Sequence, residues 1–277
     1  MVVVSSDVID RYERFSLYNS PYPAHDTGCA IDLYPDIADA ISPVSGEVLV
    51  TRAVRCPEQP YAASKDSLLL VDCGSHVARI LHVEPAVEPG DTIEVGDSLG
   101  SLIRSGFFGR WVDNHLHLGF RRPDQNLERA SGSLPIDLDI SVAGIDWDGA
   151  GTVRETGATY VRLDSPSEEP DGFAALASDE GVPLDGGLPH YTGGGALKPT
   201  TGEITLLGTA VGEIDRGVLR WRDVAVYVDG TRATGLSLFA SQGPIGAKIV
   251  FHGGHEFAVG DRVRIEIEPA TDPIRLG

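Results

Sequence analysis

Two histidines separated by a single residue are the first feature of this sequence that could do chemistry. They are His115 and His117 in NHLHLGF (114–120). Side chains two positions apart on a β-strand share a face, so both imidazoles would point one way while Leu116 and Leu118 point the other. Such a face could hold a metal ion and place a base beside it. Two incidental histidines on a polar strand face explain the same pattern.

A second segment adds the remaining ligand types. AHDTGCAIDLYP (24–35) contains His25 and Asp32. Their imidazole nitrogen and carboxylate oxygen, with one histidine of the H-x-H pair, make a set of two histidines and one aspartate. Three protein ligands and an open fourth position are typical of a catalytic zinc site. Taken alone, each residue is also explained as a loop histidine or as an aspartate that forms an Asx turn.

The elements that must position these residues are short strands. Five segments are rich in Val, Ile and Leu and are bounded by Gly, Pro or Asp. They are SGEVLVTRAV (45–54), DSLLLVDC (66–73), HVARILHV (76–83), DTIEVG (91–96) and NHLHLGF.

The whole chain is therefore expected to be mostly β, with three parts. We predict a β domain over residues 1–130, a β and loop connecting segment over 131–199, and a C-terminal all-β domain over 200–277. One short helix is expected at GFAALAS (172–178) in the connecting segment. In the C-terminal domain, Val224, Val226 and Val228 alternate with other residues, as in half-buried antiparallel strands.

The order of five segments resembles the lysostaphin/LytM-type zinc metallopeptidases over about residues 25–122. The segments are GCAIDLYP (28–35), SPVSGEVLV (42–50), SHVARILHVEP (75–85), VEPGDTIEVGDSLGSL (87–102) and NHLHLGF. The resemblance implies a barrel-sandwich domain (a duplicated hybrid motif) that holds one Zn²⁺ per chain and hydrolyses an amide bond in a peptide-like or other substrate.

Carried over by position, the resemblance implies that His25, Asp32 and His117 hold the zinc ion. His115 would be the general base that acts on the metal-bound water. His82 would position that water or stabilise the developing oxyanion.

The chain departs from the family at the first ligand. The family usually separates its first His and Asp by three residues, whereas six lie between His25 and Asp32, and three-residue spacing would place the histidine at Gly28. Either a longer loop lets His25 reach the metal, or that ligand is lost. Cys29 could replace it as a thiolate, although a small buried hydrophobic role is the ordinary one for such a residue.

A non-catalytic protein that keeps this fold and binds a metal or another ligand is the alternative function. The hairpin VEPGDTIEVGD (87–97) also resembles lipoyl- and biotinyl-carrier domains. Those carriers need a lysine in an exposed hairpin, and Lys65 in AASKDS lacks the flanking Met. A degenerate binding module therefore stays open, and a carrier is disfavoured.

The net charge of the chain limits the classes of partner that we expect it to bind. The chain has 41 acidic and 22 basic residues, a net charge of −19, and only three lysines. This dispersed acidity resembles proteins that work in molar salt, where screening removes self-repulsion; an acidic mesophilic protein is the alternative. We expect no nucleic-acid or membrane partner, because phosphate contacts need Lys and Arg patches.

We expect a cytoplasmic protein, since neither a signal peptide nor a long apolar run is evident. Peptidoglycan, the usual substrate of the family, fits such a protein poorly, so the substrate stays open. The C-terminal domain is expected to carry no catalytic residues, and either to cover one side of the N-terminal groove or to mediate self-association into a homo-oligomer. His252 and His255 have no third ligand near them in the sequence, and His190 lies in a glycine-rich segment that we interpret as a loop.

Overall fold

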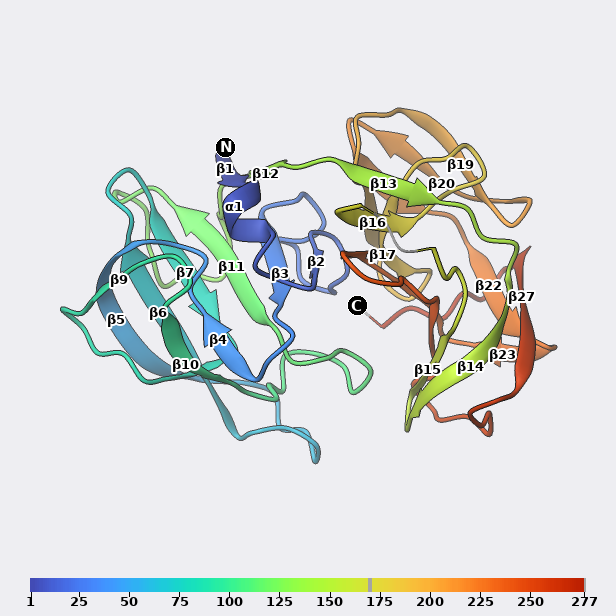
Figure 1. Cartoon of the computed structure of the whole chain (residues 1–277), viewed down its shortest axis with the longest axis horizontal. Helices are drawn as coiled ribbons and strands as arrows, with labels where there is room; N and C mark the ends of the chain where they lie inside the picture. The colour runs from blue at the N-terminus through green and yellow to red at the C-terminus, as the bar shows by residue number, and fades with distance from the viewer. Residues whose placement is uncertain (169–170, 277) are drawn as a thin grey trace. The chain divides into compact units, whose positions relative to one another are not determined.

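Short apolar strands dominate the computed structural model of the chain, which describes residues 1–168 and 171–276. Among these residues the one α-helix is α1 (Ser6–Ile9), and no helix is long and apolar enough to cross a membrane. The expectation of a mostly β protein is confirmed, with sheets that curl into half-barrel shapes (Figure 1). The chain divides into an N-terminal unit (residues 1–15 and 28–140) and a C-terminal unit (residues 16–27 and 141–277).

The N-terminal unit is built on one curled antiparallel sheet in the order β2-β3-β11-β7-β6-β5-β9. A smaller sheet, β4-β10-β8, and a parallel pair, β1-β12, complete the unit. Its strands are β1 (Val2–Ser5), β2 (Arg14–Ser16), β3 (Ala30–Tyr34), β4 (Asp39–Ile41), β5 (Gly46–Arg55), β6 (Lys65–Asp72), β7 (Val77–Leu81), β8 (Val83–Pro85), β9 (Thr92–Ile93), β10 (Ser98–Leu102), β11 (Leu116–Arg121) and β12 (Ile136–Asp139).

The large sheet of this unit follows the expected strands closely. Figure 1 shows β5, β6, β7 and β11 side by side, as their register requires. Ile80 and Leu118 are direct cross-strand partners and are fully buried. The opposite face carries His117, which pairs with Leu81 on one side and with Asp32 on the other. The alternation of the strand thus separates an apolar core face from a face with polar groups.

The C-terminal unit contains a long sheet in the order β19-β20-β21-β18-β17-β24-β26-β15-β14-β27-β22-β23, and β16 pairs separately with β13 and β25. Its strands are β13 (Val142–Ile145), β14 (Ala150–Gly157), β15 (Tyr160–Leu163), β16 (Phe173–Leu176), β17 (Leu184–Leu188), β18 (Gly193–Ala196), β19 (Gly202–Leu206), β20 (Thr209–Asp215), β21 (Val218–Trp221), β22 (Val224–Val228), β23 (Thr231–Ala233), β24 (Gly235–Leu238), β25 (Ala240–Ser241), β26 (Lys248–Val250) and β27 (Arg262–Pro269).

Alternating burial explains the core of the C-terminal unit. Val224, Val226 and Val228 of β22 are completely buried, as their spacing indicates. On the neighbouring β27, Val263 and Ile265 are buried while Arg264 between them is exposed. One apolar face of each strand therefore supplies a shared hydrophobic cluster.

The connecting segment expected over residues 131–199 differs from the structure. Its larger part belongs to the C-terminal unit, because β14 pairs with β27 and β15 pairs with β26. Residues 200–277 share one sheet with these strands and so do not stand apart from them. GFAALAS forms β16 rather than a helix, because it pairs in parallel with β13. Pairing overrides the local helical preference of its alanines.

Candidate metal centre

Asp32 and His117 face each other across β3 and β11. They are direct cross-strand partners, and His117 Nδ1 lies 2.9 Å from Asp32 Oδ1. The aspartate is buried, whereas the His117 side chain keeps 18% of its exposure. Because a carboxylate only accepts hydrogen bonds, the histidine donates here.

His25 joins this pair. The ligand atoms of His25, Asp32 and His117 all lie within 4.8 Å of one another. Ligand atoms that share one zinc ion at 2.0–2.2 Å are separated by about 3–4 Å, so the group suits a single zinc ion. The longer spacing between His25 and Asp32 is therefore compatible with a common site. Within the described residues the group does not include Cys29, which is half-buried.

The ring of His25 is oriented by the backbone. Its Nδ1 lies 2.8 Å from the carbonyl oxygen of Leu17, so Nδ1 donates and the lone pair is on Nε2. The side chain is completely buried. Histidines that bind metals commonly donate their other ring nitrogen in this way, which fixes both tautomer and orientation.

Asp185 holds the turn that contains Leu17. This fully buried carboxylate accepts hydrogen bonds from Ser16 Oγ at 2.6 Å, from the Leu17 amide at 2.6 Å and from the Tyr18 amide at 3.1 Å. These contacts fix the backbone whose carbonyl orients His25. Sequence reasoning missed Asp185, because about 170 residues separate it from its partners and no local pattern links them.

His115 lies just before β11, and its ring is buried next to Asp32. Its Nε2 is 3.5 Å from Asp32 Oδ2, while its Nδ1 donates to the Asp113 carbonyl. Arg14 holds the Asp113 side chain through a 2.7 Å ion pair. Burial lowers the pKa of His115 to about 4, although the charge of Asp32 opposes this shift. The neutral ring offers the lone pair that a general base needs.

His82 is held by a buried carboxylate, Asp66 at the start of β6. Asp66 Oδ2 lies 2.5 Å from His82 Nδ1, and Asp66 Oδ1 accepts the His82 amide at 2.9 Å. Ser105 Oγ donates to the same carboxylate at 2.5 Å. His82 has φ = 70°, an uncommon left-handed conformation. These hydrogen bonds hold the residue in it, and such strain is often found at functional sites.

The environment of Asp66 favours its ionised form. Burial raises the pKa of this carboxyl, but the hydrogen bonds from His82, Ser105 and the Ser67 amide, with the charge of His82, outweigh it and bring the pKa below its usual value. Sequence reasoning missed Asp66 as well. An aspartate at the head of an apolar strand looks like an ordinary strand boundary, and nothing local connects it to His82.

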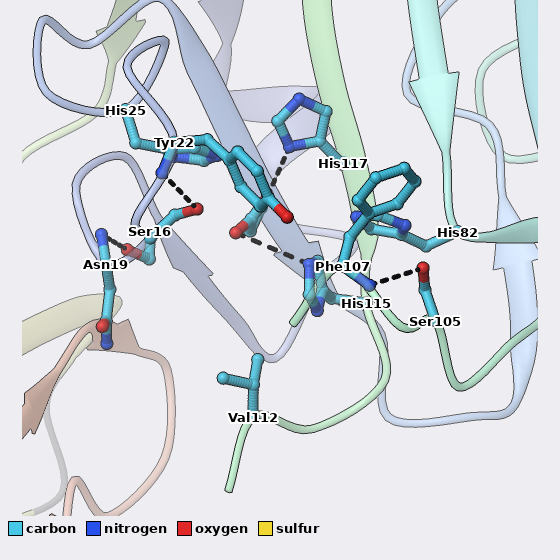
Figure 2. Close-up of polar contacts among 12 residues, drawn as sticks. Ser16, Asn19, Tyr22, His25, His82, Ser105, Phe107, Val112, His115 and His117 are labelled. Atoms are coloured by element: carbon cyan, nitrogen blue, oxygen red, sulfur yellow. Dashed lines mark hydrogen bonds and ion pairs between the residues drawn. The ribbon is translucent and has the colours of Figure 1, made fainter. Parts of the chain in front are cut away.

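Figure 2 labels the four sequence-predicted histidines, His25, His82, His115 and His117, and shows them in one neighbourhood. The ring centroids of His82 and His115 are 4.9 Å apart, and those of His82 and His117 are 5.8 Å apart. The ring of Phe108 covers those of His82 and His115, with centroid distances of 5.1 Å to His82 and 4.6 Å to His115. Aromatic surroundings exclude water and strengthen the local electrostatic interactions.

The remaining histidines contribute to no metal-ligand group that the described residues form. His252 Nδ1 lies 2.9 Å from the Thr234 hydroxyl, and His255 Nε2 bonds the carbonyls of Gly157 and Tyr160. His190 is completely buried rather than part of an open loop. His76 is bonded to the hydroxyl of Ser75.

Comparison with known proteins locates both units in one family. Residues 3–138 match the N-terminal domain of a family described as a domain of unknown function (DUF8155), and residues 143–268 match the C-terminal domain of that family. No match was found among curated proteins or among solved structures. With nearly its whole length covered by these two domains, the chain belongs to the DUF8155 family.

Proposed function

We propose that this protein is a zinc-dependent hydrolase of the metalloendopeptidase type that cleaves an amide bond. The grouping of His25, Asp32 and His117 within 4.8 Å carries the proposal. Two imidazoles and one carboxylate are a ligand set of catalytic zinc sites, in which one position is left for water or substrate. The resemblance of residues 25–122 to the lysostaphin/LytM-type peptidases supports the same assignment.

The ligand atoms have the chemistry that zinc requires. Zinc binds neutral imidazole and ionised carboxylate, so binding would replace the proton that His117 now donates to Asp32. A bound zinc ion supplies two effects: it lowers the pKa of water from ~15.7 to ~7, and it polarises a carbonyl group.

His115 and His82 would share the proton transfers. His115 has its lone pair on Nε2, beside Asp32, and would accept a proton there from the attacking water. His82 donates Nδ1–H to Asp66, which stabilises the protonated ring. Its Nε2–H would then donate to the oxyanion that develops on the substrate.

A comparison of two variants, His117→Ala and His115→Gln, tests which histidine binds zinc and which acts as the general base. We expect wild-type protein to contain about one zinc ion per chain, His117→Ala to contain almost none, and His115→Gln to keep it. Elemental analysis measures the metal. Hydrolysis is followed with a library of synthetic oligopeptides, in which mass spectrometry detects newly formed ends. His115→Gln should be slower by ~10²–10⁴-fold.

His76→Ala is the matched control, because His76 lies in the same unit and outside the metal-ligand group. It should keep both zinc and activity. Equal zinc loss in His117→Ala and His115→Gln would contradict the division of roles. Full zinc occupancy without cleavage of any peptide would favour the alternative, a metal-binding scaffold that retains the fold.

A further inference from the structure

Two arginines lie on the polar face of the N-terminal sheet, away from the metal ligands. Arg79 of β7 pairs with Gly119 of β11, and Arg121 pairs with Val77. The two arginines are therefore diagonal neighbours on one face, with Cα atoms about 7–8 Å apart. Arg121 is completely buried and Arg79 keeps only 7% exposure.

Neither guanidinium is neutralised by an acidic side chain among residues 1–168 and 171–276. The one hydrogen bond of Arg121 runs from Nη2 to the Arg129 carbonyl, and its Nε and Nη1 have no partner there. The Nε of Arg79 also lacks a partner within these residues. Burial and the charge of Arg121 lower the pKa of Arg79 to about 10, so both groups are cationic at neutral pH.

This arrangement is unexpected in a chain of net charge −19. Buried charges are normally paired, since an isolated charge in a protein interior is strongly destabilising. Carboxylates are abundant in this sequence, yet none forms an ion pair with Arg79 or Arg121 within the described residues. The thiol of Cys29 acts electrostatically on Arg121, but no carboxylate of the described residues pairs with either arginine, so an anion from outside the chain would balance their charge.

The segment that covers the arginines approaches Arg121 closely at a glycine. Gly132 has φ = +100°, and a Cβ added there would lie 3.3 Å from Arg121 Nη1, so the backbone of this exposed residue lies against the buried nitrogen. Gly119, the cross-strand partner of Arg79, adds no side chain to the same face, and the Ser133 hydroxyl would lie 3.2 Å from a Cβ there. The unpartnered guanidinium N–H groups therefore lie beneath glycine backbone and a serine hydroxyl.

We propose that Arg79 and Arg121 form a binding site for a small oxyanion, a phosphate or a carboxylate group. Two guanidinium groups present planar forks of N–H donors, the geometry that matches the oxygens of these anions. The unpartnered Nε atoms of both arginines and Nη1 of Arg121 would donate to the anion. The site uses no metal ligand and therefore does not depend on the proposed hydrolase activity.

Calorimetric titration with inorganic phosphate, and separately with acetate, tests the site. The protein is first stripped of metal and dialysed, and KCl is held constant so that only the added anion changes. We expect saturable binding of one anion per chain. Arg121→Gln and Arg79→Gln should each weaken it by at least ~10-fold, because each removes hydrogen bonds to a charged group.

Arg122→Gln is the matched control, since it removes the same charge from the next residue, whose side chain is exposed and pairs with Asp124. It should bind the anion as wild type does, and so should His117→Ala. The stronger of the two anions identifies whether phosphate or carboxylate is preferred. Absence of saturable binding to the wild-type protein would overturn the proposal without any variant. Equal binding by Arg121→Gln and Arg122→Gln, or loss in His117→Ala alone, would overturn it too.

Discussion

The two units surround their histidines with different groups. In the N-terminal unit, His82 contacts the carboxylate of Asp66, and His115 and His117 both contact that of Asp32. In the C-terminal unit, His252 contacts the Thr234 hydroxyl, and His255 contacts the backbone carbonyls of Gly157 and Tyr160. Burial lowers the pKa of His190 to about 3, and the charges of Arg275 and His252 add to this shift against an opposing backbone hydrogen bond of Leu188. A neighbouring carboxylate, more than burial, distinguishes a candidate site from a histidine of the core.

Removing the Asp32 carboxylate from the metal-ligand group is the strongest test of this difference between the two units. Asp32→Ala should lose zinc entirely, because the two imidazoles that remain give too few ligands for a stable site. His252→Ala, the control from the C-terminal unit, should retain about one zinc ion per chain. Elemental analysis of both variants, purified in parallel, decides the question. Equal zinc contents would show that the carboxylate contacts of the N-terminal unit are structural only.

The carboxylate of Asp66, which holds His82, should matter chiefly for the stability of the fold. Asp66→Ala leaves His82 and Ser105 facing a gap in a buried site, and breaking a buried ion pair costs about 3–5 kcal/mol. Urea unfolding measures the loss. A decrease of less than about 1 kcal/mol in the free energy of unfolding would mean that solvent replaces the lost contacts.

The pH dependence of this stability follows from the lowered pKa of Asp66. A group with a depressed pKa in the folded state stabilises the protein above its unfolded pKa of ~3.9, and that contribution is lost as the pH falls through the folded value. The stability difference between wild type and Asp66→Asn should accordingly be constant at neutral pH and shrink below about pH 4. A difference that grows on acidification would contradict the assignment.

Asp185 allows a finer test of how the ring of His25 is held. Asp185→Asn keeps the size of the side chain but weakens its hold on the Ser16–Tyr18 turn, whose Leu17 carbonyl orients His25. Zinc affinity should fall by about 10-fold, as is typical when a residue behind a metal ligand is changed. Competition with a zinc chelator measures the affinity. Asp179→Asn, at an exposed carboxylate of the same unit, should leave it unchanged.

The smallest expected effect is the salt dependence of the melting temperature, which arises from the charge of the whole chain. The chain has a net charge of −19, and its acidic side chains repel one another at low ionic strength, where the Debye length is ~30 Å at 0.01 M. Near 1 M salt the Debye length is ~3 Å, and this repulsion is screened. The melting temperature should rise by at least ~3 °C between 0.1 and 2 M KCl, which corresponds to about 1 kcal/mol. A flat or falling Tm would contradict a salt-adapted protein.

Local patterns were sufficient to predict much of the N-terminal sheet. Short segments rich in Val, Ile and Leu and bounded by Gly, Pro or Asp predicted β5, β6, β7 and β11 to within one or two positions. His115, however, precedes β11 instead of sharing a strand face with His117. It reaches Asp32 from a loop that Arg14 and Asp113 hold in place.

The residues that support the site could not be predicted, because their partners are distant in sequence. Asp66 meets His82 only through the pairing of β6 with β7, and Asp185 binds a turn that precedes it by about 170 residues. Arg79 and Arg121 are far apart in the sequence, and only the strand register shows that they are buried neighbours. Such long-range partners depend on the tertiary fold and leave no periodic signal.

X-ray absorption spectroscopy of the zinc-loaded protein tests the central claim most directly. The account predicts one zinc ion per chain with nitrogen and oxygen ligands only, at ~2.0–2.2 Å, from His25, Asp32 and His117. The His25→Ala variant should lose one imidazole from this shell. A sulfur ligand at ~2.3 Å would show that Cys29 has replaced His25, and a shell of water alone would show that these residues form no zinc site.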